Sequence, residues 1–234
     1  MPLIKAHDGY LTVFNMFTTD SEEHHDRLLE EMQKIIDNGN GGRDFTGWLS
    51  STLHAGQAAL GTANYIQWRS LEDLENRYAG QDYKNETVPL FQEISTSVNL
   101  LKTEVVFSQH HPDLDRIEIS PERDDWTVII VMECAPQDQQ ALVDLLGRRD
   151  DWLPTVPGYR SHCICRGIDG TFIILYAQWA SEAAYDAYHH MPETERPADQ
   201  QEMRAAVDKL VTARRANTYR VVHSRSAQPA PSAR

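Results

Sequence analysis

Hydrophobic and polar positions in the first part of the chain follow the period of a strand and then that of a helix. Residues 10–17 (Tyr-Leu-Thr-Val-Phe-Asn-Met-Phe) are rich in β-branched and aromatic side chains, which is typical of a strand. Residues 20–23 resemble a capping box, and from Leu28 to Ile36 apolar side chains recur at helical spacing. The Asn-Gly-Asn-Gly-Gly run at 38–42 predicts the end of this helix.

The pattern continues with further strands and helices. Residues 46–54 and 59–69 are expected to form two strands joined by a turn. The elements expected after them are a short helix over 70–78 capped by Ser70, a helical stretch over about 90–101 and a strand over 103–108. The resulting order, strand-helix-strand-strand-helix-strand, is that of a ferredoxin-like unit.

The second half of the chain repeats the first. When Gly47 is placed on Gly158 and the offset is kept without a gap, identical residues coincide further along the chain. These pairs are Gly56 with Gly167, Tyr65 with Tyr176, Gln67 with Gln178, Trp68 with Trp179 and Ser70 with Ser181. Such an ordered set indicates a tandem duplication. The expected helices of the second half cover about 137–148, 181–190 and 198–214.

The duplication predicts an α+β fold built from two ferredoxin-like (βαββαβ) units. The units span residues 1–108 and 126–224, with a linker at 109–125 and a disordered tail at 225–234. A single unit leaves one face of its sheet open, so we expect the two units to pack their sheets together. The product is an intramolecular pseudodimer, an α/β barrel. Two independent domains on a tether are the alternative.

Charge and composition exclude several classes of function. Lys and Arg number 22 against 35 Asp and Glu, and the net charge of −13 repels nucleic-acid phosphates and anionic membrane surfaces. No apolar run approaches the roughly 18 residues of a membrane span, and the first residues do not resemble a signal peptide. The 3 cysteines cannot form a disulfide framework. We therefore expect a cytoplasmic protein whose partner is a small molecule, with no nucleic acid and no membrane.

Polar side chains interrupt apolar rows on two of the predicted strands. Alternation places Asn64, Ile66 and Trp68 on one face of their strand. Asn15 lies in an otherwise apolar row that includes Phe17. A buried carboxamide without a partner is strongly unfavourable, so each Asn needs a partner in the protein or in a ligand. Either Asn alone is equally a satisfied core amide, whereas the two amides and the indole together indicate a site.

A duplicated ferredoxin-like unit with Asn15 on its first strand and Asn64-x-x-x-Trp68 on its third resembles the antibiotic biosynthesis monooxygenase family. The resemblance covers the chain from Leu11 to about Ser224. It implies a dimeric α/β barrel that oxidises anthrone-like phenols of aromatic polyketide pathways to quinones with molecular oxygen. It also implies that no flavin, haem or metal takes part, and it places the catalytic roles on Asn15, Asn64 and Trp68.

A reaction without a cofactor makes clear demands on the site. Triplet oxygen reacts slowly with closed-shell molecules, so the ionised substrate must supply an electron. The amides of Asn15 and Asn64 can stabilise the developing oxyanion, and the indole of Trp68 can stack on the ring system. The side chains expected to bind the aromatic substrate are Phe17, Ile66, Tyr78, Trp179, Tyr185 and His189.

The second half departs from the family pattern. It keeps Trp179, but Leu175 stands in the place of Asn64 and Ile130 in the place of Asn15. We expect this half to carry a degenerate site that has lost the amide pair. It either completes the cavity of the first half or holds a different site.

Other functions remain open at this stage. In haem-degrading relatives an Asn, a Trp and a helix His form the site, and here Trp68 and His189 lie in different halves. A non-catalytic ligand-binding module of the same fold is a further hypothesis. The histidine pairs at 24–25, 110–111 and 189–190 do not converge on one ion, so no metal is predicted. The sequence does not decide whether two chains pair into a homodimer.

Overall fold

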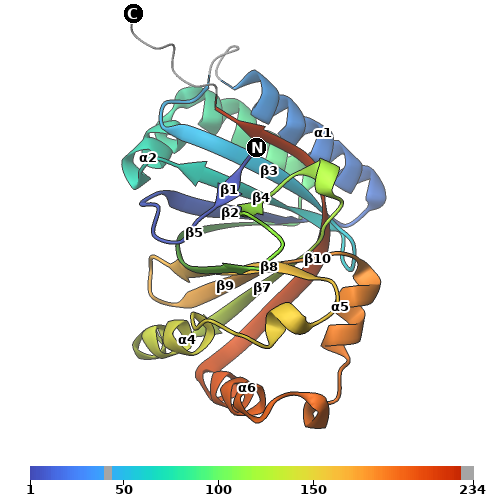
Figure 1. The fold of residues 1–234 in the computed structure, drawn as a ribbon. Coiled ribbons are helices and arrows are strands. Elements are labelled where there is room, and N and C mark those ends of the chain that lie inside the picture. The colour runs from blue at the N-terminus through green and yellow to red at the C-terminus, as the bar shows by residue number, and fades with distance from the viewer. Residues whose placement is uncertain (40–43, 228–234) are drawn as a thin grey trace, which may run out of the picture.

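The computed structural model describes residues 1–39 and 44–227 (Figure 1). In this part of the chain the long strands close into one barrel, in the order β10-β3-β4-β2-β5-β8-β9-β7, and all neighbours are antiparallel. The first half supplies β2 (Leu11–Thr18), β3 (Trp48–Gly56), β4 (Gly61–Trp68) and β5 (Ser97–His110). The second half supplies β7 (Trp126–Cys134), β8 (Tyr159–Gly167), β9 (Phe172–Trp179) and β10 (Val211–Ser226). The predicted pseudodimer is confirmed.

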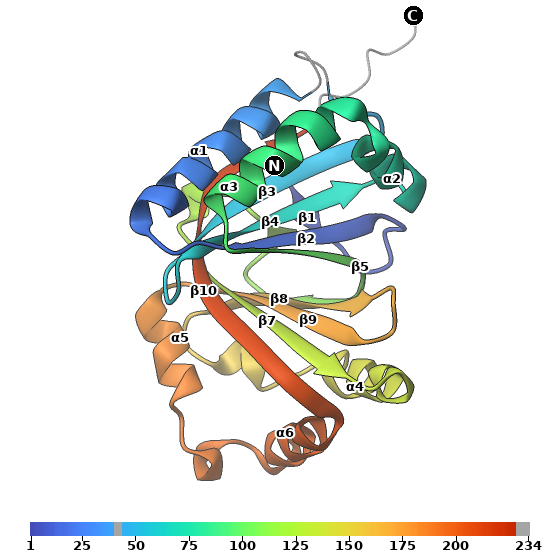
Figure 2. The same ribbon diagram turned by 180° about the vertical axis from the view of Figure 1, so that it is seen from behind.

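Helices cover the outside of the barrel (Figure 2). Those of the first half are α1 (Glu22–Asn38), α2 (Leu71–Ala79) and α3 (Val88–Ile94), with a π-helical turn η1 (Tyr83–Thr87) between the last two. Those of the second half are α4 (Gln139–Leu146), α5 (Glu182–His189) and α6 (Ala198–Leu210). Short 3-10 turns occupy 121–123, 136–138, 153–155 and 193–195. No helix in the described ranges is both long and apolar enough to cross a bilayer.

Two long strands tie the halves together. β5 pairs with β2 over residues 97–103 and with β8 over 103–110. β10 pairs with β7 over residues 211–220 and with β3 over 219–226. In Figure 2, β10 runs from the lower half of the molecule into the upper one. The last strand of each half thus continues into the sheet of the other half, which rules out two independent domains on a tether.

The helix expected over 90–101 is too long. α3 ends at Ile94, and β5 begins at Ser97, ahead of the strand expected over 103–108. The first residues of β5 pair with β2, which would otherwise present an open edge. This tertiary pairing overrides the local helical pattern.

The same effect shortens the last helix. α6 ends at Leu210 rather than at the end of the expected range 198–214, because the next residues pair with β7. The first two residues of the tail expected at 225–234 belong to a strand, since β10 continues to Ser226 along the edge of β3. Residues 228–234 lie outside the described part of the chain.

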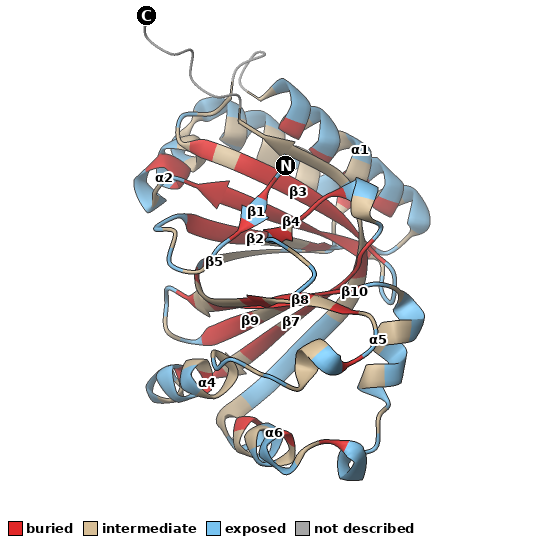
Figure 3. Cartoon of the chain, viewed as in Figure 1, coloured by how far each residue is buried: buried red, intermediate tan, exposed pale blue. Residues whose placement is uncertain are grey.

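Buried residues are concentrated in the barrel strands (Figure 3), whose two faces pack against different partners. The barrel interior is filled by side chains from both halves, among them Phe14, Tyr65, Ile129, Cys163, Cys165, Ile174, Tyr176 and Tyr219. The outer face of the first half packs against α1, α2 and α3 through Val13, Phe17, Leu28, Met32, Leu53, Ile66, Trp68, Leu74 and Ile94. Alternation therefore points the row of Asn64 and Trp68 towards the helices, not into the barrel.

The glycine that anchors the repeat has the same conformation in both halves. Gly47 has φ +75° and Gly158 has φ +81°, in the left-handed region that favours glycine. A Cβ at Gly47 would lie 2.1 Å from the side chain of Asp73, and one at Gly158 would lie 2.4 Å from that of Ala184. These turns place the starts of β3 and β8 directly against the helices α2 and α5. A side chain at either glycine would clash there, which explains why both copies keep glycine.

The segment expected to be a linker at 109–125 packs against the interior of the barrel. Its strand β6 (Ile117–Glu118) pairs with β1 (Leu3–Ile4), and Ile119 is fully buried. Ile4, Ile117 and Ile119 pack with the interior side chains. Gln67 and Gln178, which coincide in the repeat, hold the β1–β6 strand pair in place. Gln67 donates to the carbonyl of Leu3 at 3.0 Å, and Gln178 donates to the carbonyl of Glu118 at 3.0 Å.

Candidate functional site

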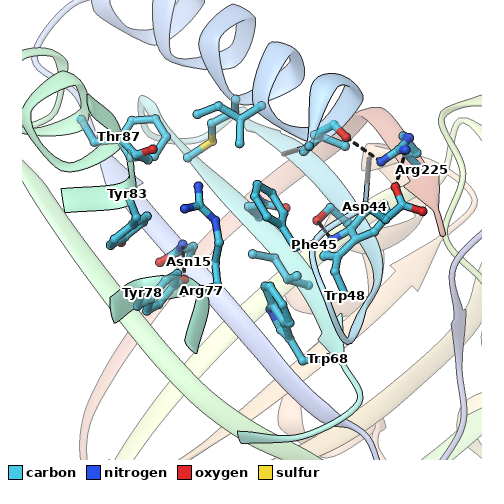
Figure 4. A pocket seen from close by; sticks show the side chains of 18 residues that line it. Asn15, Asp44, Phe45, Trp48, Trp68, Arg77, Tyr78, Tyr83, Thr87 and Arg225 are labelled. Atoms are coloured by element: carbon cyan, nitrogen blue, oxygen red, sulfur yellow. Dashed lines mark hydrogen bonds and ion pairs between the residues drawn. The ribbon is translucent and has the colours of Figure 1, made fainter. Parts of the chain in front are cut away.

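A pocket lies between the outer face of the first-half sheet and the helices that cover it (Figure 4). It thus lies on the helix side of the first-half sheet and not in the interior of the barrel. Its lining comprises Asn15, Met32, Ile35, Ile36, Gly39, Asp44, Phe45, Trp48, Ser51, Asn64, Ile66, Trp68, Arg77, Tyr78, Tyr83, Thr87, Phe91 and Arg225. Aromatic and aliphatic groups dominate, with a few polar groups among them, as in most small-molecule sites.

The two predicted catalytic amides face each other across neighbouring strands. Asn15 on β2 lies directly opposite Asn64 on β4, so both side chains leave the same face of the sheet. Asn15 Nδ2 donates to the hydroxyl of Tyr78 at 3.4 Å. Asn64 is 8% exposed, and its Oδ1 is buried with no hydrogen-bond partner among the described residues. One amide of the pair is therefore anchored and the other is left with an unsatisfied atom.

The indole of Trp68 is a second unsatisfied group at the same face. Trp68 is 3% exposed, and its Nε1 has no acceptor among the described residues. Trp48, on the neighbouring strand, provides a contrast because its Nε1 donates to Ser51 Oγ at 2.9 Å. A buried donor or acceptor without a partner is destabilising by about 1–3 kcal/mol. The free atoms of Asn64 and Trp68 are what a bound molecule could satisfy.

Two stacked tyrosines form another wall. Tyr78 on α2 and Tyr83 on η1 stack with ring centroids 4.4 Å apart and planes at 15°. Burial raises the pKa of Tyr78, so its hydroxyl is neutral at physiological pH. That oxygen accepts from Asn15, which leaves its proton free to be donated to a ligand. The π-helical turn supplies Thr87 as well as Tyr83 to the pocket, and such turns often mark functional sites.

Arg77 enters the pocket between aromatic rings and was not predicted from the sequence. Its guanidinium carbon lies 4.1 Å from the ring centroid of Phe45 and 5.1 Å from that of Tyr83. Figure 4 shows the side chain in the middle of the pocket. Desolvation by burial lowers its pKa. In the sequence it is one basic residue in the last turn of a helix, where a favourable interaction with the helix dipole suffices to explain it.

Arg225 reaches this pocket from the second half of the chain. It lies on the part of β10 that pairs with β3 and forms an ion pair with Asp44. It also donates to the carbonyl of Ile36 at 2.8 Å, and its guanidinium lies 4.8 Å from the ring centroid of Trp48. The sequence does not indicate this role, because it depends on the crossing of β10, which no local pattern predicts.

The predicted substrate-binding residues do not all meet at this pocket. Ile66 and Tyr78 line it, whereas Phe17 does not and packs against the lining residue Phe91, with ring centroids 5.0 Å apart. Trp179, Tyr185 and His189 belong to the other half and do not line it.

Those three residues form a cluster of their own. The ring of Trp179 lies 6.1 Å from that of Tyr185 and 4.8 Å from that of Tyr188, and Tyr185 Oη lies 3.4 Å from His189 Nδ1. Tyrosine rings thus pack on the tryptophan that corresponds to Trp68. His189 is exposed on α5, so the structure does not assemble the Asn, Trp and His of the haem hypothesis.

The second half has no amide pair at the corresponding place. Ile130 on β7 lies directly opposite Leu175 on β9, as Asn15 lies opposite Asn64. The same register thus presents two apolar side chains instead of two amides. Within the described residues, no group of three His, Cys, Asp or Glu side chains is placed to hold a metal ion.

Comparison with known proteins gives consistent matches. The family model described as antibiotic biosynthesis monooxygenase matches residues 126–200. Tetracenomycin-F1 monooxygenase of Streptomyces glaucescens is 37% identical over 75 residues, which are 32% of this chain and 67% of that protein. The crystal structure of an anthrone oxidase-like protein is 42% identical and has a TM-score of 0.90 over 100% of both chains. The crystal structure of a protein from Fusobacterium nucleatum, at 9% identity and TM-score 0.63 over 94% of this chain and 95% of that one, shares the fold alone.

Proposed function

Because this chain belongs to the antibiotic biosynthesis monooxygenase family and is therefore an oxidoreductase of the monooxygenase type, we propose that it oxidises an anthrone-type polycyclic phenol to a quinone. Molecular oxygen is the co-substrate and no cofactor takes part. The observation that carries the proposal is the pocket, where the unsatisfied atoms of Asn64 and Trp68 lie among aromatic walls. The names of tetracenomycin-F1 monooxygenase and of the anthrone oxidase-like protein support a polyketide intermediate as the substrate.

The proposed reaction inserts one oxygen atom at the ring methylene and releases the other as water. Loss of a proton gives an anion whose charge spreads over the fused rings, and this anion transfers one electron to oxygen. Recombination of the radical pair with a proton gives a hydroperoxide at the same carbon. Loss of water, which takes the remaining hydrogen of that carbon, leaves the quinone carbonyl.

The pocket residues have distinct tasks in this scheme. The amide N–H groups of Asn15 and Asn64 stabilise the oxyanion of the ionised substrate, which promotes its ionisation. The free Asn64 Oδ1 accepts a hydrogen bond from a hydroxyl group of the substrate. Trp68 donates its free indole N–H or stacks on the rings. The neutral Tyr78 hydroxyl donates its proton in a hydrogen bond and fixes Asn15. The apolar walls keep water from the radical pair.

The proposal is tested by oxygen uptake with protein stripped of metal and flavin, using dithranol, a dihydroxyanthrone, as the substrate. We expect uptake with formation of the corresponding quinone. The double substitution Asn64→Ala, Trp68→Phe should lower the rate about a hundredfold, since removing a donor from an oxyanion site has effects of that size. Melting temperature and circular dichroism show whether the variant is folded.

Trp179→Phe makes the matching change in the second half and decides which half holds the site. A larger loss from this variant than from Trp68→Phe would contradict the placement in the first half. Binding of the anthrone without oxygen uptake above the uncatalysed rate would instead favour a non-catalytic binding module.

A further inference from the structure

Arg77 carries a positive charge into the pocket, and no carboxylate of the described lining forms an ion pair with it. Among the described residues it forms no ion pair and no hydrogen bond, and Asp82 is the only carboxylate whose charge acts on it appreciably. The other arginine of the pocket, Arg225, is paired with Asp44. Arg69, which flanks the same helix, is paired with Asp73. A half-buried guanidinium in an apolar pocket is unusual without an anion, since desolvation disfavours the charge.

The surroundings of Arg77 hold its guanidinium group in one orientation. Phe45 and Tyr83 contact it within cation–π distance. The fork of N–H donors is thus directed into the pocket that also contains the unsatisfied atoms of Asn64 and Trp68. A planar fork of donors matches the two oxygens of a carboxylate, which it can bind with two parallel hydrogen bonds.

We propose that Arg77 binds a carboxylate group of the aromatic substrate, so that the protein selects polycyclic phenols that carry a carboxylic acid. This inference rests on the proposed function for the identity of the ring system. Beyond the ring system, the pocket then recognises a carboxylate substituent, and Arg77 is the residue that binds it. The alternative is that Arg77 only packs against its aromatic neighbours and the end of α2.

Direct binding measurements separate these two roles. The probes are an anthraquinone that bears one carboxylate and the same ring with a carboxamide in its place, titrated against the full chain with tryptophan fluorescence or calorimetry as the readout. We expect the carboxylate to bind about tenfold more tightly than the carboxamide, the usual size of a charge-assisted pair. Arg77→Gln should reduce this ratio to about one and leave carboxamide affinity unchanged.

Two further variants keep the test decisive. Arg77→Lys retains the charge but not the planar fork and should keep part of the preference. Arg149→Gln removes an exposed arginine that does not line the pocket and should keep all of the preference. If Arg77→Gln fails to fold, the ratio of carboxylate to carboxamide affinity in the wild type and in Arg77→Lys still distinguishes carboxylate binding from simple packing.

Several results would overturn the inference. These are equal affinities of the wild type for the two probes, a preference that survives in Arg77→Gln, or no binding of either probe. A hydroxyanthraquinone with an ionised phenol is a further probe. If it binds more tightly than the carboxylate probe and loses this advantage in Arg77→Gln, then Arg77 binds a phenolate, which would also overturn the inference. Since binding needs no oxygen, a carboxylate preference without oxygen uptake would contradict the proposed function but not this inference.

Discussion

Two buried histidines influence how the stability of this protein depends on pH. His54 is fully buried in the barrel, where its Nε2 lies 3.0 Å from the hydroxyl of Tyr176. His162 is buried under the second-half helices, and its Nδ1 lies 2.8 Å from the hydroxyl of Tyr159. Desolvation lowers the pKa of both histidines from 6.5 to about 4. Both are therefore neutral in the folded protein over most of the physiological range.

This predicts a loss of stability in mild acid. Well above pH 6.5 neither the folded nor the unfolded chain protonates these histidines, so they have no effect on stability. Between pH 6.5 and about 4 the unfolded chain binds the protons and the folded one does not, so the free energy of unfolding falls as pH falls. Each histidine should lower it by about 2 kcal/mol between pH 7.5 and pH 5.

Urea denaturation at the two pH values measures this loss. His162→Asn should remove about half of the pH dependence assigned to the pair. His7→Asn, a change at an exposed position, should leave it unaltered. An unfolding free energy that does not change between the two pH values would contradict the prediction.

At the scale of the elements, local sequence patterns predicted which helices and strands form, whereas pairing between distant strands determined where several of them begin or end. Ser70 caps α2 as expected, with its Oγ accepting from the N–H of Asp73. The row of Asn64 and Trp68 was predictable because strand alternation is a local property. The start of β5 and the crossing of β10 were not, since both depend on strand edges distant in sequence. Arg225 was missed for the same reason.

The end of β10 should therefore matter for the pocket of the other half. Arg225→Ala removes the ion pair with Asp44, the hydrogen bond to the Ile36 carbonyl and the contact with Trp48. We expect a loss of about 1–2 kcal/mol in unfolding free energy, because the partners are partly buried. Affinity for an anthraquinone probe should fall as well, since Arg225 lines the pocket.

Arg215→Ala is the matched control on the same strand. Arg215 pairs with Glu133 through side chains that are 56% and 44% exposed, so its loss should change stability by less than about 1 kcal/mol. Equal effects of the two substitutions would show that the crossing contributes nothing specific to the first-half pocket.

For the whole molecule, the closed barrel predicts that the two halves unfold together. β5 and β10 each belong to the hydrogen-bonded ladders of both halves, and interior side chains such as Tyr65 and Tyr176 pack across the boundary. Neither half can lose its structure without opening the sheet and core of the other. The chain should therefore behave as one cooperative unit despite its duplicated architecture.

Scanning calorimetry tests this expectation. One transition is expected, with a van't Hoff enthalpy about equal to the calorimetric enthalpy. Two resolved transitions, or a calorimetric enthalpy about twice the van't Hoff value, would show that the halves melt separately. Arg225→Ala should move the single transition to lower temperature without splitting it.

The unequal strand pairs, Asn15 with Asn64 in one half and Ile130 with Leu175 in the other, show what fusing two copies makes possible. In a symmetric dimer of identical chains every mutation appears twice, so a change that fills a cavity fills both. In a single chain with both copies, one unit can drift while the other remains under selection. The half with the apolar pair is then free to accumulate stabilising substitutions, and it is the natural region to diversify in directed evolution when the pocket with the amide pair must stay intact.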